Sequence, residues 1–202
     1  MTKQTLQKII KESKIEIKKI ADRNGWTWFY EMHQKEVIKY AEKLLSMYKK
    51  ADREAVLISC WLHDIAHYYA KDGKEILKVK KFHHVNGAKL AEKFLEKYNL
   101  DKKEIDKIKN CILRHRNNEQ YPARTLEEKI VAVADTLSHF GSIFYFTYFK
   151  FHPNHSLERM VEDDLAKLKR EWRDIQILPK AKKLVENEYK TIKKLMENYN
   201  KK

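Results

Sequence analysis

Residues 59–70 read SCWLHDIAHYYA, and the way this stretch folds decides how the rest of the chain is interpreted. Its many apolar residues predict a buried helix, yet His63, Asp64 and His67 lie in its middle. Ionisable groups lose favourable hydration when they are buried, so they need a partner inside the protein. We therefore expect other polar residues of the chain to meet this stretch in the fold.

The composition of the chain predicts a single all-α domain spanning residues 1–202. Apolar residues make up 43% of the 202 residues and aromatic residues 11%, which is sufficient for a globular core. Only 4 glycines and 3 prolines are present, so a strand-rich fold with many tight turns is not expected. Apolar residues instead recur with a helical period along most of the chain.

Eight helices are expected from this period and from the residues that cap helix ends. They cover about residues 3–22, 27–49, 52–70, 80–98, 101–115, 126–140, 156–174 and 179–200. Asp101 with Glu104, and Thr125 with Glu128, match the capping box of a helix N-terminus. The segment RNNEQYPAR, residues 116–124, is predicted to be a loop.

The net charge of +14 allows two interpretations. Lysines alternate with glutamates, as in KESKIEIKK at residues 11–19, and this pattern is typical of solvated helix faces. A basic field also attracts anionic substrates such as phosphates. A nucleic-acid-binding helical domain is kept only as a weaker hypothesis, which predicts a steep loss of affinity with salt and no need for a metal.

Cysteine usage and hydropathy indicate a cytoplasmic protein without a membrane segment. Cys60 and Cys111 lack CxxC spacing and lie in apolar helical contexts, so we expect free buried thiols in a reducing compartment. No apolar run approaches the length of about 18 residues that suggests a membrane span. The N-terminal residues MTKQTLQKIIKESK lack the apolar core of a signal peptide.

Ionisable residues recur on the apolar faces of the other expected helices. His33, His115 and Asp135 each lie in register with an apolar stripe. A lone buried histidine is usually hydrogen-bonded within the core, but that interpretation would have to hold several times in one small domain. A shared divalent cation supplies one partner for all of them, and imidazole with carboxylate suits Mn, Fe, Co, Ni, Mg or Zn.

In their order along the chain, these residues resemble the HD superfamily of metal-dependent phosphohydrolases. The family pattern is a histidine on one helix, an adjacent His-Asp on the next and a distant aspartate, here His33, His63-Asp64 and Asp135. The flanking segments CWLHDIAH, FHHVNGAKLAEKFL and EEKIVAVADTLSHFG are similar to the family as well. The resemblance covers about residues 26–141 and implies an HD-type helical bundle, on which helices of about residues 142–202 pack.

The resemblance also implies a metal site. One divalent ion would be held by four residues: His33, His63, Asp64 and Asp135. Family members with two ions add two histidines and let the motif aspartate bridge, and His83 and His115 stand at the matching places, so a second ion is left open. His84 competes with His83 for this role, although it aligns with a packed apolar stripe. The chain has a single His115 and no GYP loop, which argues against cleavage of cyclic dinucleotides.

The implied reaction is hydrolysis of a phosphate ester or anhydride, with a nucleotide as the first choice of substrate. Asp64, Asp135 or His67 would accept the proton of the attacking water, while His67 has the alternative role of orienting a ligand. Four basic residues are candidates for binding the phosphate or else belong to the solvated surface: Lys80, Lys81, Arg114 and Arg116. Arg116 is preferred because a guanidinium grips phosphate with two hydrogen bonds.

Two further questions are left open by the sequence. An aromatic patch is expected either to stack on a base or to form core or a dimer face, and it comprises Phe144, Tyr145, Phe146, Tyr148 and Phe149. A homo-oligomer is therefore also open. The alternative to an enzyme is an HD-type sensor module that binds metal and nucleotide without turnover.

Overall fold

The helix that carries the SCWL segment is buried on all sides. In the computed structural model, which describes residues 2–152 and 154–199 except for the side chain of Tyr148, α4 (Arg53–Leu62) is buried at every position from Ala55 to Leu62. One face of α4 packs into an apolar core through Val56 and Cys60. The opposite face packs into a second core. Burial on both faces explains why the stretch is apolar without the polar stripe of a surface helix.

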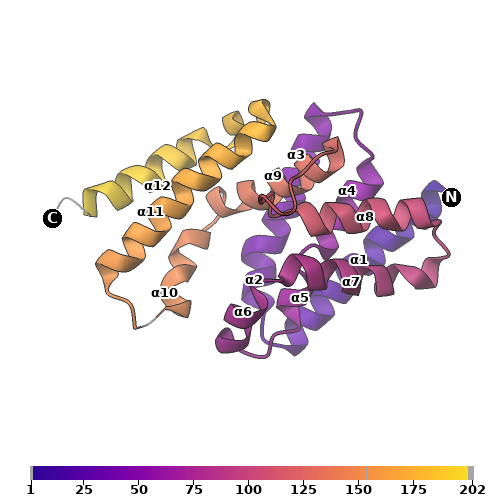
Figure 1. Ribbon diagram of the computed structural model, residues 1–202, viewed down its shortest axis with the longest axis horizontal. Helices are drawn as coiled ribbons and strands as arrows, with labels where there is room; N and C mark the ends of the chain where they lie inside the picture. The colour runs from indigo at the N-terminus through magenta and orange to yellow at the C-terminus, as the bar shows by residue number, and fades with distance from the viewer. Residues whose placement is uncertain (1, 153, 200–202) are drawn as a thin grey trace.

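The two cores divide the remaining helices between them. One core joins α4 to the N-terminal and middle helices, namely α1 (Lys3–Arg23), α5 (Ile65–Tyr68), α7 (His83–Leu95) and α8 (Lys102–Arg114). The other joins α4 to α3 (Lys35–Met47), α9 (Leu126–Phe140), α11 (Leu157–Asp174) and α12 (Glu186–Tyr199). Every regular element in the described part of the chain is a helix (Figure 1), so the prediction of an all-α domain is confirmed.

The C-terminal helices α11 and α12 lie side by side at one end of the molecule (Figure 1). Short 3₁₀ segments, Ile175–Ile177 and Pro179–Leu184, connect them. Trp172 stacks on Tyr189 with ring centroids 4.2 Å apart, and this contact fixes α11 against α12. Val161, Leu165 and Leu168 of α11 enter the same core as α9. The C-terminal helices therefore pack on the part of the chain that carries the His-Asp residues.

Local sequence signals placed several helix ends correctly. Both predicted capping boxes are present, Asp101 with Glu104 at the start of α8 and Thr125 with Glu128 at the start of α9. Residues 116–124 form a loop. No single helix among the described residues is both long and apolar enough to cross a membrane. Only α9 combined with Phe144–Phe151, across a 76° bend, satisfies that criterion.

Two helices that were expected to be continuous are interrupted at the ionisable residues. The range 27–49 is divided into α2 (Thr27–Phe29), a π-helix over Tyr30–Gln34, and α3. The range 52–70 breaks at His63 and Asp64 between α4 and α5, with Asp64 at φ −103° and ψ 17°. A π-turn or a break changes the direction of a side chain relative to a regular helix. Periodicity did not reveal these interruptions.

Other boundaries differ after residue 70 and after residue 179. An additional helix that was not expected, α6 (Gly73–Val79), follows α5, and the Asp72 side chain caps it by accepting the backbone N–H of Glu75. The helix predicted from residue 80 therefore begins at His83. The helix predicted from residue 179 begins as a 3₁₀ turn, and α12 starts only at Glu186.

A close contact between α7 and the break after α4 depends on Gly87. A Cβ atom at Gly87 would lie 2.9 Å from the backbone oxygen of His63. That separation is shorter than real Cβ contacts allow, and the neighbour is backbone that cannot rotate away. The absence of a side chain at this position therefore lets α7 bring its first turn against the His63-Asp64 break.

Candidate metal centre

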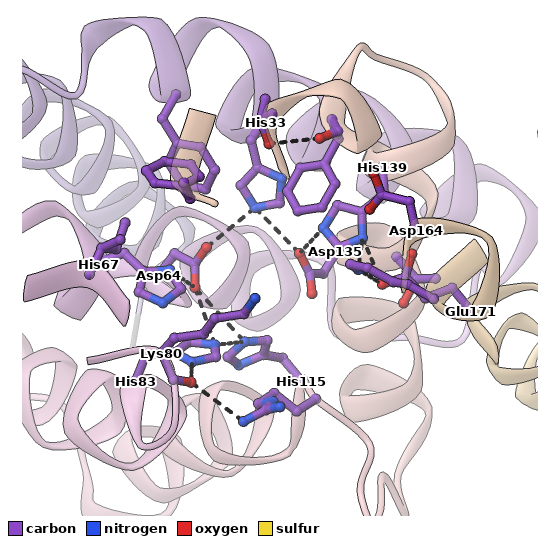
Figure 2. A pocket seen from close by; sticks show the side chains of 18 of the residues that line it. His33, Asp64, His67, Lys80, His83, His115, Asp135, His139, Asp164 and Glu171 are labelled. Atoms are coloured by element: carbon purple, nitrogen blue, oxygen red, sulfur yellow. Dashed lines mark hydrogen bonds and ion pairs between the residues drawn. The ribbon is translucent and has the colours of Figure 1, made fainter. Parts of the chain in front are cut away.

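Four sequence-predicted residues from three separate elements meet at one point, and Figure 2 shows three of them, His33, Asp64 and Asp135. His33 comes from the π-helix, His63 and Asp64 from the break after α4, and Asp135 from α9. The His33 Nε2 atom lies 3.3 Å from an oxygen of Asp64 and 3.3 Å from an oxygen of Asp135. The His63 Nε2 atom lies 3.5 Å from the same two oxygens. The two Nε2 atoms are 3.4 Å apart.

The second nitrogen of each of these histidines is held by a hydrogen bond. His63 Nδ1 donates to the backbone oxygen of Cys60 at 2.8 Å. His33 Nδ1 lies 2.9 Å from Ser138 Oγ, and Ser138 donates its own proton to the Asp135 backbone oxygen at 2.6 Å. The hydroxyl therefore accepts from His33. In their neutral forms, both histidines thus carry the proton on Nδ1 and direct the lone pair of Nε2 at the carboxylates.

A second pair of histidines is arranged in the same way on the other side of Asp64. His83 Nδ1 donates to the Lys80 backbone oxygen at 2.8 Å, and His115 Nδ1 to the Ile112 backbone oxygen at 2.6 Å. Their Nε2 atoms are only 3.0 Å apart. Both face the second oxygen of Asp64, Oδ1, at 3.5 Å from His83 and 3.9 Å from His115.

When both rings are neutral, each histidine pair has one proton fewer than its three contacts require. Two neutral rings carry two protons, and in each pair both protons are used by the Nδ1 contacts described above. The remaining contact, Nε2 to Nε2, then joins two lone pairs, which repel unless a proton or a cation lies between them. The deficit occurs twice, once in the His33–His63 pair and once in the His83–His115 pair, with Asp64 between the pairs.

The residues present fit one or two divalent ions. Ligand atoms about 2.1 Å from a shared ion lie roughly 3.0–3.5 Å from their neighbours, and five of the six distances among the four ligand atoms of the first group are 3.3–3.5 Å. Asp64 Oδ1 is buried and finds no hydrogen-bond donor within the described ranges. Imidazole nitrogens and carboxylate oxygens, with no thiolate, are the ligands that Mn, Fe, Co, Ni and Zn accept.

Comparison with models of known protein families identifies the family to which this chain belongs. A family model of the HD domain matches residues 30–139, more than half of the chain. The chain belongs to the HD-domain family. No curated protein and no solved structure matches it. The matched segment includes all six residues of the two groups, from His33 to Asp135, whereas α11 and α12 lie outside it.

Burial and neighbouring charges shift the pKa values of the two carboxyl groups in the HD cluster. Burial opposes ionisation of Asp64, but His67 and His63 hold the pKa of its carboxyl well below the usual range. Burial likewise opposes ionisation of Asp135, but His63, His139 and His33 together outweigh it and lower the pKa. Both carboxylates are therefore anionic and ready to bind a cation at neutral pH.

The histidines respond to these carboxylates in different ways. Burial disfavours the charged form of His63, but Asp64 and Asp135 overcome it and raise the pKa to about 9. Burial lowers the pKa of His115 to about 4 and that of His83 to about 2. Without an ion, a proton on His63 therefore provides positive charge between the His33 and His63 rings. The His83 and His115 rings stay neutral.

His67 and His84 have different positions relative to the cluster. His67 Nδ1 is 3.2 Å from Asp64 Oδ1 without the alignment of a hydrogen bond, and its ring stacks on His83 with centroids 4.2 Å apart. The imidazole of His84 is turned away from the carboxylates toward Tyr121, with ring centroids 5.4 Å apart. The structure thus brings His83, and not His84, against Asp64.

A cavity of about 310 Å³ opens onto the cluster (Figure 2). Two of the four predicted phosphate-binding residues, Lys80 and Arg116, line it. Arg116 is oriented by the backbone oxygen of Lys81 at 3.3 Å. Lys81 is itself exposed outside this lining and lies over the Phe82 ring. Arg114 is turned away, because it pairs with Glu128 at 3.6 Å and donates to a backbone oxygen of the loop.

Aromatic residues form part of the cavity wall, but the members of the predicted aromatic patch do not line it together. Phe144 lines the cavity, together with Phe29 and Phe151. Tyr145 is buried, Phe149 is half-buried and Phe146 is exposed. The side chain of Tyr148 lies outside the described part of the chain. One member of the patch, Phe144, is therefore placed to contact a ligand.

Sequence reasoning missed a group of polar residues that α11 contributes to the cavity. Lys167, Arg170 and Glu171 line its wall, and so does His139 of α9. His139 follows Asp135 by one helical turn, a spacing that offered a signal in the sequence. The residues of α11 carried no such signal, because they are separated from the HD residues by the loops and turns after α9.

Proposed function

We propose that this HD domain is a metal-dependent phosphohydrolase that acts on a small phosphorylated molecule, with a nucleotide as the first choice. The observation that carries this proposal is the arrangement around Asp64: two imidazole pairs, each one proton short when its rings are neutral, face opposite oxygens of one carboxylate. A site with this donor set gains most from two divalent cations, and cations beside a phosphate-sized cavity favour phosphoryl chemistry.

The proposal assigns the ligands as two sets that share Asp64. His33, His63 and Asp135 would hold the first ion together with Asp64 Oδ2, and His83 and His115 would hold the second together with Asp64 Oδ1. Divalent ions in such a site lower the pKa of water toward neutrality and polarise a phosphoryl oxygen. Fixed Nδ1 contacts mean that little reorganisation of the rings is needed when the ions bind.

Other residues of the cavity are assigned to the substrate and its protons. His67 borders Asp64 and is 12% exposed at its side chain, so it has access to the cavity and is proposed as the proton acceptor or donor together with Asp64. Lys80 and Arg116 form no ion pair with a carboxylate in the part of the chain that the structure describes. Their charges are therefore available for phosphate oxygens.

The size and wall of the cavity support a nucleotide. A volume of about 310 Å³ lies at the lower end of small-molecule sites. Phe29 and Phe144 are apolar rings on which a base can stack. Free, buried thiols at Cys60 and Cys111 further support a reducing compartment, and we propose the cytoplasm.

Phosphate release from a panel of nucleoside mono-, di- and triphosphates tests this function. The protein is stripped with a chelator and assayed before and after addition of Mn²⁺. We expect activity only after addition of the metal. Arg116→Ala should lower kcat/KM by about 10–100-fold, the loss of one or two charge-assisted hydrogen bonds. Lys81→Ala, which removes a neighbouring charge outside the cavity lining, is the matched control and should retain activity.

Two outcomes separate the alternatives. Tight nucleotide binding by the Mn²⁺-loaded protein without turnover of any substrate would identify a sensor module instead of an enzyme. Phosphate release that is equally fast in the stripped protein would contradict the proposed metal dependence. Binding of nucleic acid with a steep salt dependence and no metal requirement would favour the nucleic-acid-binding hypothesis.

A further inference from the structure

A fifth ionisable residue borders the first group of ligands without a role in the assignments above. His139 lies one turn after Asp135 on α9, and its Nε2 atom is 3.8 Å from Asp135 Oδ1. That distance is too long for a hydrogen bond. His33, Asp135 and His139 each offer one ligand atom, and these three atoms all lie within 4.8 Å of one another. The side chain also lines the cavity.

The orientation of the His139 ring is set by α11. His139 Nδ1 lies 3.1 Å from Glu171 Oε1 and 3.4 Å from Lys167 Nζ, and Lys167 is itself paired with the same Glu171 oxygen. A carboxylate only accepts hydrogen bonds, so the shorter contact places the proton of His139 on Nδ1. Nε2 then presents its lone pair toward Asp135 and the cavity.

The group that orients His139 is itself held firmly. Tyr145 donates to the other oxygen of Glu171 at 2.7 Å. The Phe144 ring stacks on the imidazole with centroids 3.6 Å apart and an interplanar angle of 21°. Glu171 is 8% exposed and His139 is 8% exposed, so water competes little for these contacts. A buried carboxylate that fixes the tautomer of a histidine is the usual support of a metal-bound imidazole.

We propose that His139 is an additional protein ligand of the ion at His33, His63, Asp64 and Asp135, and that Glu171 is its positioning residue. This inference rests on the proposed metal centre. The spacing is compatible with it: two atoms that bind one ion at about 2.1 Å can lie at most about 4.2 Å apart, and the 3.8 Å between His139 Nε2 and Asp135 Oδ1 is within this limit.

The inference gives the C-terminal part of the chain a function in the centre. The segment that matches the HD family ends at His139, and Glu171 lies beyond it on α11. Packing of α11 against α9 therefore does more than bury apolar surface. It places the Glu171 carboxylate against His139, so binding of the first ion depends on the position of α11.

Binding of Co²⁺ alone, without substrate, tests the inference. The stepwise affinities are measured by competition with a chelator, and the visible spectrum of the Co²⁺-loaded protein reports its ligands. We expect His139→Gln to weaken one of the two affinities by about 10–100-fold and to change the spectrum, and Glu171→Ala to weaken the same affinity. Glu162→Gln, an exposed position on the same helix, is the matched control and should match the wild type.

The outcomes distinguish this inference from the proposed function. Affinities within twofold of wild type and an unchanged spectrum in both His139→Gln and Glu171→Ala would overturn the role of His139 while leaving the other ligands in place. A wild-type protein that binds no Co²⁺ would overturn both. If circular dichroism shows that His139→Gln does not fold, the result for Glu171→Ala decides, because this substitution leaves the imidazole present.

Discussion

The pKa of His63 shows most clearly how the charges of the site act on a single residue. Burial opposes its charge, yet the two carboxylates raise its pKa from 6.5 to about 9. The metal-free folded protein thus binds a proton at His63 more tightly than the unfolded chain does. This proton stabilises the metal-free fold below pH 6.5, and the contribution is lost as the pH rises through about 9.

The same shift predicts proton release when a metal binds. An ion can bind the Nε2 lone pair of His63 only after the proton has left, so the affinity for the first ion should rise with pH up to about 9. His83 and His115, whose pKa values are lowered by burial, have no proton to lose at neutral pH. Calorimetry at pH 7 in buffers of different ionisation enthalpy should show about one proton released for the first ion and almost none for the second. Equal release for both ions would contradict this assignment.

Substitution of the shared carboxylate has the largest predicted effect of any single change. Asp64→Asn leaves a side chain of the same shape but removes the charge between the two histidine pairs. We expect metal affinity to fall by more than about 100-fold and activity to be lost, while the far-ultraviolet circular dichroism stays that of a helical protein. Asp106→Asn, a half-buried surface position on α8 that lies outside the two ligand groups, serves as the control. Full metal content in Asp64→Asn would count against the central role of Asp64.

At the level of helices, the centre depends on how closely α7 approaches the break after α4. Gly87→Ala places a Cβ 2.9 Å from the His63 backbone oxygen, so α7 must move outward and carry His83 with it. We expect a loss of about 1–3 kcal/mol in the free energy of unfolding and a larger loss of affinity for the second ion than for the first. Urea denaturation and metal titration measure the two effects.

Gly73→Ala is the matched control for that experiment. A Cβ at Gly73 would meet only the Phe151 ring at 3.4 Å, an ordinary contact, so stability should change little or increase slightly. A Gly87→Ala protein as stable and as well metallated as Gly73→Ala would show that α7 does not need the close approach.

The sequence predicted the helices better than their interruptions, for physical reasons. Capping boxes at Asp101 and Thr125 are local signals, and both are present. At the break, the His63 backbone oxygen lies against α7 at Gly87, a tertiary contact that no local pattern encodes. The short helix α6 was not expected between residues 70 and 80, and Asp72 caps it.

For the whole molecule, the proposed ions would act as cross-links between elements that are distant in sequence. The two ligand sets join the π-helix, α4, α7, α8 and α9. An ion that binds only the folded state at 100 times its Kd adds about 2.7 kcal/mol of stability, which raises the Tm of a chain of this size by roughly 5–11 °C. Thermal melts with Mn²⁺ and with a chelator should differ by this amount, and melts of Asp64→Asn should not differ.

The candidate site was partly predictable at this scale. His33, His63, Asp64 and Asp135 were found because histidine and aspartate on apolar helix faces require a shared partner, and the order along the chain resembled a known family. The choice between His83 and His84 needed the rotation of α7 about its axis, which periodicity leaves undetermined. The contribution of Glu171 needed the docking of α11, which arises from the core between α9 and α11 rather than from any local motif.

Anomalous diffraction at the manganese edge, from crystals grown with Mn²⁺, tests the central claim most directly. We predict a strong peak about 2.0–2.3 Å from His33 Nε2, His63 Nε2 and the carboxylates of Asp64 and Asp135, with a second peak between Asp64, His83 and His115. Crystals that contain Mn²⁺ elsewhere but show no anomalous density beside Asp64 would contradict the account.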